Sequence, residues 1–272
     1  MELNPSLRSE MQRHFQRMEH EFGSQILSQP DSPCWLPSDA MAVQTGMPEL
    51  NRELGLPGLP RGHIVELLGP EHSGKSTLAL RLIAAAQAAG ATVALIDAAH
   101  QLDAHTAFAL GVRGENLLLS HPSDAEQALG ITEVLVRSNV VDFIVIDAVS
   151  ALVPRMELAR LTADYTQAGT ALVLLRAMYR LKPKLSRSGC CLLFVDQLRD
   201  RDEHPFGLPE TLLSTRTLNP FTSIRMVLRR EQMCAITGDG PSAMARLSIR
   251  KNRLGLMGGC LTIPWVAMPE CC

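Results

Sequence analysis

Apolar residues recur at a helical spacing near the start of the chain. The positions are Leu7, Met11, Phe15, Met18 and Phe22. Steps of three and four place side chains on one face of a helix, so we expect an amphipathic helix over residues 5–22. A proline-rich stretch through residue 37 separates this helix from the rest of the chain. A lone helix must bury its apolar stripe somewhere, so we expect residues 1–37 to form a separate arm that either folds back on its own core or serves as an assembly arm by packing on a neighbouring subunit.

From residue 62 onward, short apolar runs alternate with segments of helical periodicity. The runs predict strands at residues 64–68, 92–97, 116–120, 142–147 and 190–196. The intervening segments predict helices at 75–89, 124–137 and 166–185. Such alternation is typical of a parallel sheet covered by helices on both faces. We expect residues 38–272 to form one α/β core with a mostly parallel central sheet.

The pattern changes at the two ends of this core. Residues 223–230 and 243–250 predict two strands joined around Gly238-Asp239-Gly240, which is a strong turn signal. Residues 262–266 predict a last strand, and a short helix is expected near 48–54. The sheet is therefore expected to end in antiparallel strands.

Composition narrows the class of protein. The 272 residues are 46% hydrophobic and carry a formal net charge of −2, so any DNA site must be a local patch or be created by assembly. Seven cysteines without a C-x-x-C pair predict free thiols. The charged start of the chain shows no secretory signal, and no apolar run is long enough for a membrane span. We expect a cytoplasmic protein without a membrane partner.

A phosphate-binding loop follows the strand expected at 64–68. It fits G-x-x-x-x-G-K-[ST] at every fixed position and stands between a strand and a helix, as the chemistry requires. Its backbone N–H groups and the helix N-terminus favour phosphate oxygens. Lys75 would reach the β- and γ-phosphates of ATP, and Ser76 would ligate Mg²⁺. The loop consists of Gly69, Pro70, Glu71, His72, Ser73, Gly74, Lys75 and Ser76.

Two carboxylates end apolar strands. Asp147 closes the run at 142–147, which is the usual position of the second Mg²⁺ ligand in a P-loop protein. The alternative is that Asp147 only caps a loop. Asp97 also ends a strand, and for it a structural cap and a catalytic role are both open.

Blocks along almost the whole chain resemble, in order, those of the bacterial RecA family. The resemblance includes the N-terminal helix and stops where RecA proteins continue into a C-terminal domain. The blocks are Gly69 to Thr77, Ile96 to Asp103, Glu126 to Leu129, Val141 to Pro154, Phe206 to Glu210, and Lys251 to Arg253.

The resemblance implies ATP at subunit interfaces of a filament on single-stranded DNA. It adds Thr77 and Asp103 to the nucleotide site and makes Gln197 the sensor of the γ-phosphate. Lys251 and Arg253 would reach the phosphates bound by a neighbouring subunit. Residues 154–164 and 199–218 would face DNA, and the DNA-binding candidates there are Arg199, Phe206 and Arg216.

The chain departs from the family at several of these positions. Ala99 stands where the family has the glutamate that polarises the attacking water, and Thr106 stands at its adenine-stacking tyrosine. Asp196 replaces an asparagine before Gln197, and the second DNA-facing loop is slightly acidic. Because a missing base slows phosphoryl transfer, we expect weak hydrolysis.

Two hypotheses for function follow. The first is a RecA-class recombination protein and DNA-dependent ATPase that binds ATP, Mg²⁺ and single-stranded DNA and assembles through its N-terminal arm. The second is a nucleotide-dependent adaptor that regulates another repair protein and hydrolyses little ATP. Simpler interpretations also remain: Gln197 as a buried amide at a strand end, Phe206 as loop packing, and the basic residues between 176 and 187 as a solvated helix face.

Overall fold

The computed structural model describes residues 20, 41–158, 167–198, 213–232 and 243–264. The chain divides into two units, residues 1–38 and 39–272. The helix expected at 5–22 lies outside the described residues apart from His20, so the N-terminal arm stays a prediction. None of the described helices is long and apolar enough to cross a bilayer.

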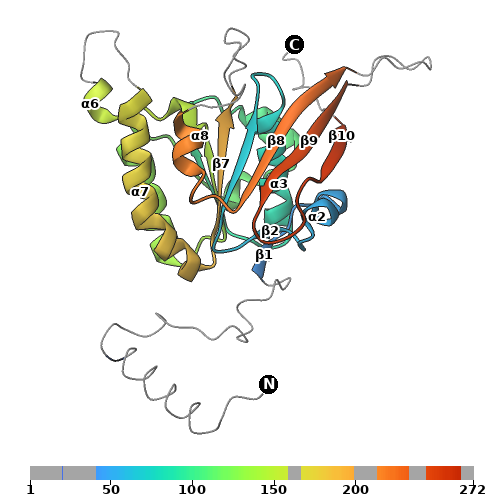
Figure 1. Cartoon of the computed structure of the whole chain (residues 1–272), viewed down its shortest axis with the longest axis horizontal. Helices are drawn as coiled ribbons and strands as arrows, with labels where there is room; N and C mark the ends of the chain where they lie inside the picture. Colours follow the sequence, from blue (N-terminus) through green and yellow to red (C-terminus); the bar gives the residue numbers. More distant parts are fainter. Residues whose placement is uncertain (1–19, 21–40, 159–166, 199–212, 233–242, 265–272) are drawn as a thin grey trace, which may run out of the picture. The chain divides into compact units, whose positions relative to one another are not determined.

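An eight-stranded sheet forms the centre of the second unit (Figure 1). The strand order is β10-β9-β8-β3-β7-β6-β4-β5. The strands are β3 (Ile64–Gly69), β4 (Val93–Asp97), β5 (Leu117–Ser120), β6 (Phe143–Asp147), β7 (Cys191–Gln197), β8 (Ile224–Gln232), β9 (Ala243–Asn252) and β10 (Cys260–Pro264).

Strand direction follows the sequence pattern. Following the order of the sheet, all neighbouring pairs from β8 to β5 are parallel, whereas β8–β9 and β9–β10 are antiparallel. The predicted α/β class and mostly parallel sheet are therefore confirmed, with strand ends shifted by one or two residues. The turn expected at 238–240 lies outside the described residues. A second sheet of two short strands, β1 (Ala42–Val43) and β2 (Leu59–Pro60), was not predicted.

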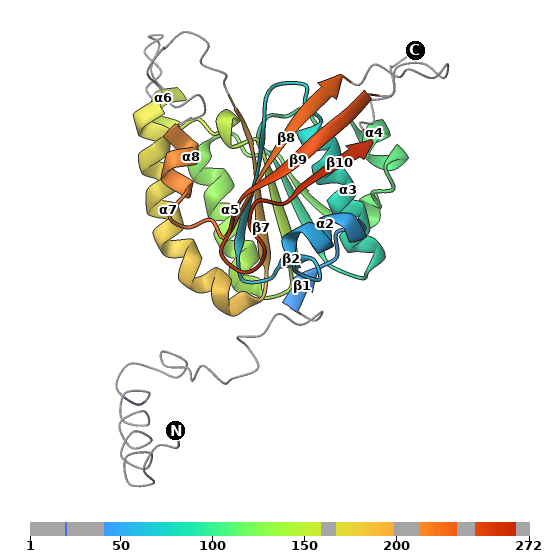
Figure 2. The same cartoon turned by 45° about the vertical axis from the view of Figure 1, so that its right-hand side comes forward.

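Helices cover both faces of the sheet (Figure 2). On one face α2 (Pro48–Leu54) and α3 (Lys75–Ala88) share a core with the sheet, and on the other α5 (Ala125–Ser138) and α7 (Gln167–Ser188) do so. Shorter helices are α4 (Ala104–Ala109), α6 (Arg155–Leu158) and α8 (Leu213–Leu218). The helix expected at 166–185 continues past Pro183 and ends at Gly189, whose positive φ of 66° suits glycine.

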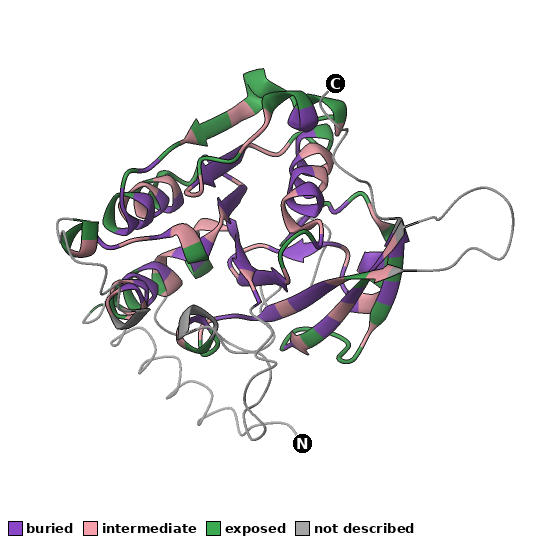
Figure 3. Ribbon diagram, turned by 90° about the horizontal axis from the view of Figure 1, so that it is seen from above, coloured by how far each residue is buried: buried purple, intermediate pink, exposed green. Residues whose placement is uncertain are grey.

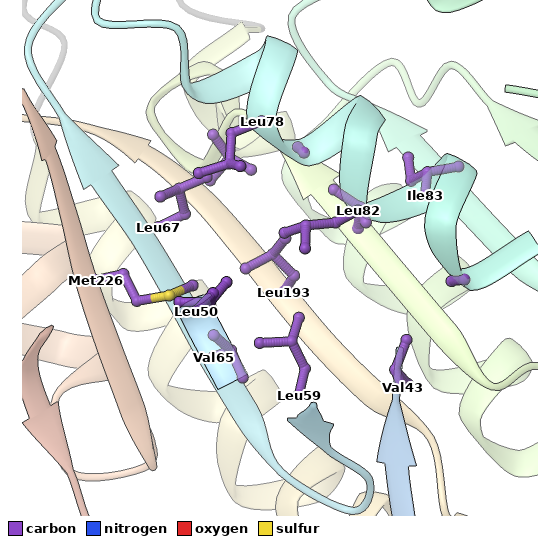
Figure 4. Close-up of a cluster of buried hydrophobic side chains, with 14 of the residues drawn as sticks. Val43, Leu50, Leu59, Val65, Leu67, Leu78, Leu82, Ile83, Leu193 and Met226 are labelled. Atoms are coloured by element: carbon purple, nitrogen blue, oxygen red, sulfur yellow. The ribbon is translucent and has the colours of Figure 1, made fainter. Parts of the chain in front are cut away.

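Side chains along the central strands point alternately to the two faces of the sheet, so the hydrophobic core is divided into two clusters. In β3, Val65 and Leu67 pack against α2 and α3, whereas Ile64 belongs to the core beneath α5 and α7. Figure 4 shows the first of these clusters, with Leu78 and Leu82 of α3 above β3 and β7. Strands buried on both faces have apolar residues at nearly every position. This explains why the sequence shows continuous apolar runs, and Figure 3 shows the same burial across the sheet.

Candidate nucleotide-binding site

The carboxyl edge of the parallel sheet gathers the candidate residues. Register pairs Gly69 at the end of β3 with Gln197 at the end of β7, and Asp147 of β6 with Asp97 of β4. Sites in α/β sheets form where parallel strands end, because the loops there diverge. The structure thus brings together four of the segments that the sequence singled out separately.

The P-loop joins β3 to α3. Gly74 has φ 89° and His72 has φ 56°, so the backbone curls twice before the helix starts. A Cβ on Gly69 would collide with Ser73 Oγ and the Leu228 carbonyl, so glycine is required there. Ser73 is buried, and its Oγ contacts no hydrogen-bond partner among the described atoms. These features form a backbone cradle of the size that a phosphate group fills.

Lys75 lies at the centre of this cradle. Its Nζ donates a hydrogen bond to the Pro70 carbonyl over 2.6 Å. Burial lowers the pKa of Lys75, while the carboxylates of Asp147, Asp196 and Glu71 oppose that shift. The ammonium group is thus held among acidic side chains at the mouth of the loop.

Asp147 and Ser76 form the candidate metal site. Burial raises the pKa of Asp147, whereas a hydrogen bond from Ser76 and the charge of Lys75 act in the opposite direction. A carboxylate beside a hydroxyl presents the hard oxygen ligands that Mg²⁺ prefers. The donor set therefore fits Mg²⁺ at the position that the sequence indicated.

Asp97 holds the loop that follows β4. Its side chain is buried and accepts hydrogen bonds from the backbone N–H groups of Gln101 (3.1 Å) and Leu102 (3.0 Å). His121 Nδ1 lies 3.4 Å from Asp97 Oδ2 and its ring stacks on His100. These contacts support the structural cap that the sequence left open. The sequence analysis missed His121, although it directly follows the strand expected at 116–120.

A small cavity of about 40 Å³ opens beside Ala99. The polar residues that line it include Ser76, Asp97, Asp103, Thr106 and Asp147. Asp103 caps α4 by accepting hydrogen bonds from the backbone N–H groups of His105 and Thr106. A volume of this size has room for water. The methyl group of Ala99 offers that water no acceptor.

Gln197 points towards the P-loop. Its Nε2 lies 3.5 Å from Glu71 Oε2, and its backbone N–H donates to Asp196 Oδ1 over 2.9 Å. The Gln197 side chain is only partly exposed and Asp196 is buried. This placement suits a residue that responds to the group held by the loop.

Lys251 and Arg253 lie at the opposite, amino edge of the sheet. Asn252 pairs with Ile224 at the start of β8, which runs parallel to β3. Lys251 Nζ donates to the Asn219 carbonyl, and Arg253 Nη1 donates to the Pro220 carbonyl over 3.2 Å. Both residues are therefore remote from the P-loop of their own chain.

The DNA-facing candidates are only partly described. Arg216 lies in α8 and is exposed, whereas Arg199 and Phe206 fall outside the described residues. The sequence analysis missed a hollow of about 470 Å³ on β8, β9 and β10. Arg229, Arg246 and Arg250 line it, and Arg246 also pairs with Glu231. Arg246 and Arg250 lie four residues apart on β9, and such an even spacing places both on one face of a strand.

The comparisons with known proteins agree with this geometry. The model of the RecA N-terminal domain family matches residues 9–257. The chain belongs to the RecA N-terminal domain family. It is similar to Protein RecA of Rubrobacter xylanophilus, with 44% identity over 213 residues that cover 78% of this chain and 62% of the relative.

Other RecA relatives show similar agreement. Protein RecA 1 of Myxococcus xanthus is 43% identical over 212 residues, covering 78% of this chain and 62% of that protein. Protein RecA of Geobacter sulfurreducens is 38% identical over 238 residues, covering 88% and 70%. The chain thus spans less than two thirds of the length of the first two RecA proteins named here.

Proposed function

We propose that this chain is an ATP-binding RecA-like protein of homologous recombination or DNA repair, assembled from copies that share nucleotide sites. One observation carries this proposal: the two halves of the expected phosphate site lie on opposite edges of one sheet. The P-loop follows the carboxyl end of β3, whereas Lys251 and Arg253 stand at the amino edge beside the start of β8.

A single chain cannot bring these halves together. The six residues of β3 span roughly 20 Å at about 3.3 Å per residue, which exceeds the reach of any side chain. Two copies stacked head to tail would place the Lys251 and Arg253 of one against the P-loop of the other. Repetition of such a contact is heterologous, and it produces an open filament when the rotation does not close.

The carboxyl edge supplies the ATP and Mg²⁺ site. The P-loop amides and Lys75 would hold the phosphates, and Ser76 and Asp147 would hold Mg²⁺, which neutralises phosphate charge. Gln197 lies within reach of the loop through Glu71 and would report the occupancy of the γ-phosphate position. Asp103 lines the adjoining cavity and would lie beside the nucleotide.

Single-stranded DNA is the proposed polymer ligand. Positive charge is needed for phosphate binding, and the hollow lined by Arg229, Arg246 and Arg250 supplies it within a chain that is slightly acidic overall. Arg216 of α8 is a further exposed cation. Arg199 and Phe206 stay candidates from the sequence alone.

A second candidate function rests on Ala99. The methyl side chain faces a cavity beside Ser76 and Asp147 and cannot accept a proton from water. A chain that binds ATP without turning it over would work as a nucleotide-dependent adaptor of another repair protein. ATP binding and assembly belong to both candidates, whereas DNA-stimulated turnover belongs only to the first.

The experiment that distinguishes the two candidate functions measures ATP hydrolysis by the full chain, with Mg²⁺, in the presence and absence of single-stranded DNA. Turnover that DNA stimulates supports the recombination protein. ATP-dependent self-association without turnover in either condition supports the adaptor. Absence of both ATP binding and self-association would refute the shared nucleotide site.

A further inference from the structure

Helix α7 carries basic residues on two different flanks. On the flank towards α5, Lys184 and Arg180 both pair with Glu133, and the Arg180 Nε to Glu133 Oε2 distance is 3.7 Å. Glu133 therefore compensates the cations on that side of the helix. This part of the basic run matches the solvated helix face considered for the sequence.

The other flank faces the segment between α8 and β8. Tyr179 of α7 meets Phe221 edge to face, with ring centroids 5.1 Å apart and planes at 89°. Lys182 follows Tyr179 by three residues, so both side chains emerge on the same flank. The half-buried Lys182 thus approaches residues 219–221 at the amino edge of the sheet.

The same short segment positions two further cations. Lys251 donates to the carbonyl and, over 3.2 Å, to the Oδ1 of Asn219. Arg253 donates to Pro220, while its backbone N–H donates to the Ser223 carbonyl over 3.0 Å. Lys182, Lys251 and Arg253 therefore converge from a helix and a strand that are far apart in sequence.

No carboxylate forms an ion pair with these three cations within the part of the chain that the structure describes. The charge of Glu66 acts on Lys251, but this buried carboxylate is already paired with Arg225, whose Nε lies 2.6 Å from it. Burial and the charge of Arg253 lower the pKa of Lys182, and burial and the same arginine lower the pKa of Lys251. Convergent cations that repel one another are stabilised when a polyanion binds between them.

We propose that Lys182 joins Lys251 and Arg253 in a three-cation site that binds the polyphosphate of a nucleotide held by the next copy. The assignment to a nucleotide in the next copy rests on the proposed function. The convergence of the three cations favours a compact polyphosphate. A DNA strand would need a continuous track of positive charge, whereas Glu133 reduces the positive charge on the other flank of α7.

The first test uses inorganic tripolyphosphate and the full chain carrying Lys75→Ala, so that the chain's own P-loop does not contribute. Calorimetry at low salt should show binding that Lys182→Met weakens about tenfold, as expected for losing one charge-assisted contact. Lys184→Met is the matched control, because it removes the same charge from the same helix and should leave affinity unchanged. Lys182→Arg should restore most of the binding.

Equal affinity in the Lys182→Met and Lys184→Met variants would overturn the site, provided that both variants show the unfolding transition of the parent. So would a loss of single-stranded DNA binding in Lys182→Met with tripolyphosphate binding intact, since that would make Lys182 a DNA contact. These outcomes do not depend on assembly.

The second test measures ATP-dependent assembly by light scattering with Lys75 intact. Lys182→Met should raise the ATP concentration for half-maximal assembly about tenfold, while a fluorescent ATP analogue binds dilute protein unchanged. If the parent chain never assembles, but Lys182→Met still weakens tripolyphosphate binding, the proposed function is refuted and the cation site is supported. Assembly at the same ATP concentration in Lys182→Met and Lys184→Met would refute the role of Lys182 towards the next copy.

Discussion

The two edges of the sheet carry opposite charge. At the carboxyl edge, Asp97, Asp147 and Asp196 end three parallel strands or lie one residue before their ends, and the charges of Asp147, Asp196 and Glu71 act on Lys75. At the amino edge, Lys182, Lys251 and Arg253 converge, and the buried Glu66 that acts on Lys251 is already paired with Arg225. Each edge by itself is electrostatically unbalanced.

This difference explains how one chain can offer an incomplete site at each end. At the acidic edge, the carboxylates outside the P-loop repel the phosphates of ATP. The basic edge attracts phosphates but has no P-loop to bind a nucleotide. On the proposed function, the cations of one copy would meet the phosphates bound by the next copy, and both imbalances would be relieved. A complete phosphate site would then need a pair of copies.

The largest expected effect concerns the missing base at the carboxyl edge. Ala99→Glu should raise ATP turnover by about 10²–10⁴, because a carboxylate would orient and deprotonate the water in the adjoining cavity. ATP affinity should change little, since the P-loop groups stay in place. Steady-state hydrolysis and analogue binding check this. Fast native turnover that disappears in Glu71→Gln or Asp196→Asn would show that another carboxylate already acts as the base.

Loss of Lys75, the half-buried cation at the carboxyl edge, should have the next largest effect. Lys75→Ala should weaken ATP binding about a hundredfold, because charged hydrogen bonds to the phosphates are lost. Fluorescent ATP-analogue titration with Mg²⁺ measures this. Lys184→Ala serves as the control and should bind ATP like the parent. An unchanged affinity in Lys75→Ala would remove the phosphate-site assignment.

Mixing two variants tests whether the edges meet in trans. Lys75→Ala removes a phosphate-binding cation from the carboxyl edge, and Lys251→Ala removes one from the amino edge. Neither variant alone should therefore assemble with ATP. In the mixture, the intact carboxyl edge of Lys251→Ala can join the intact amino edge of Lys75→Ala, and the outer edges of the resulting pair are both altered. Sedimentation should therefore detect ATP-dependent pairs in the mixture, and two Lys251→Ala preparations mixed together provide the control. Absence of pairs in the mixed sample would argue for sites completed within one chain.

The smallest expected effect concerns the acid that lies between the two edges. Glu66→Gln should lower the free energy of unfolding by about 2 kcal/mol, since it leaves the mostly buried Arg225 without its carboxylate. Glu231→Gln is the matched control on the next strand, where the pair with Arg246 is exposed and solvent screens it, so the variant should lose much less stability. Urea denaturation measures both variants. Equal losses would mean that burial of Glu66 does not strengthen its pair.

The local pattern of apolar and polar residues was enough to predict most of the strands and helices. Continuous apolar runs predicted the parallel strands, since a strand buried on both faces has few polar positions. The change of pattern after residue 220 predicted the antiparallel strands that end the sheet. The helix expected at 166–185 already passes through Pro183, and in the structure it continues three residues further, to Ser188.

The carboxyl-edge site was also largely predictable. A P-loop consists of contiguous residues, so the spacing of its fixed positions is enough to recognise Gly69 through Ser76 in the sequence. Asp147 could be added because parallel strands end at one edge, and that rule would also have found His121. The roles of Arg199 and Phe206 stay predictions, since they lie outside the described residues.

The sequence by itself determined what depends on neighbours along the chain: the P-loop and the strand and helix periods. Only the tertiary structure decided what depends on strand order and helix rotation. It set Lys251 and Arg253 on the edge away from the P-loop, paired Glu66 with Arg225, and turned Lys182 away from Glu133. The physical reason is that charges act through space over several ångströms, and residues that far apart in sequence are brought together only by packing.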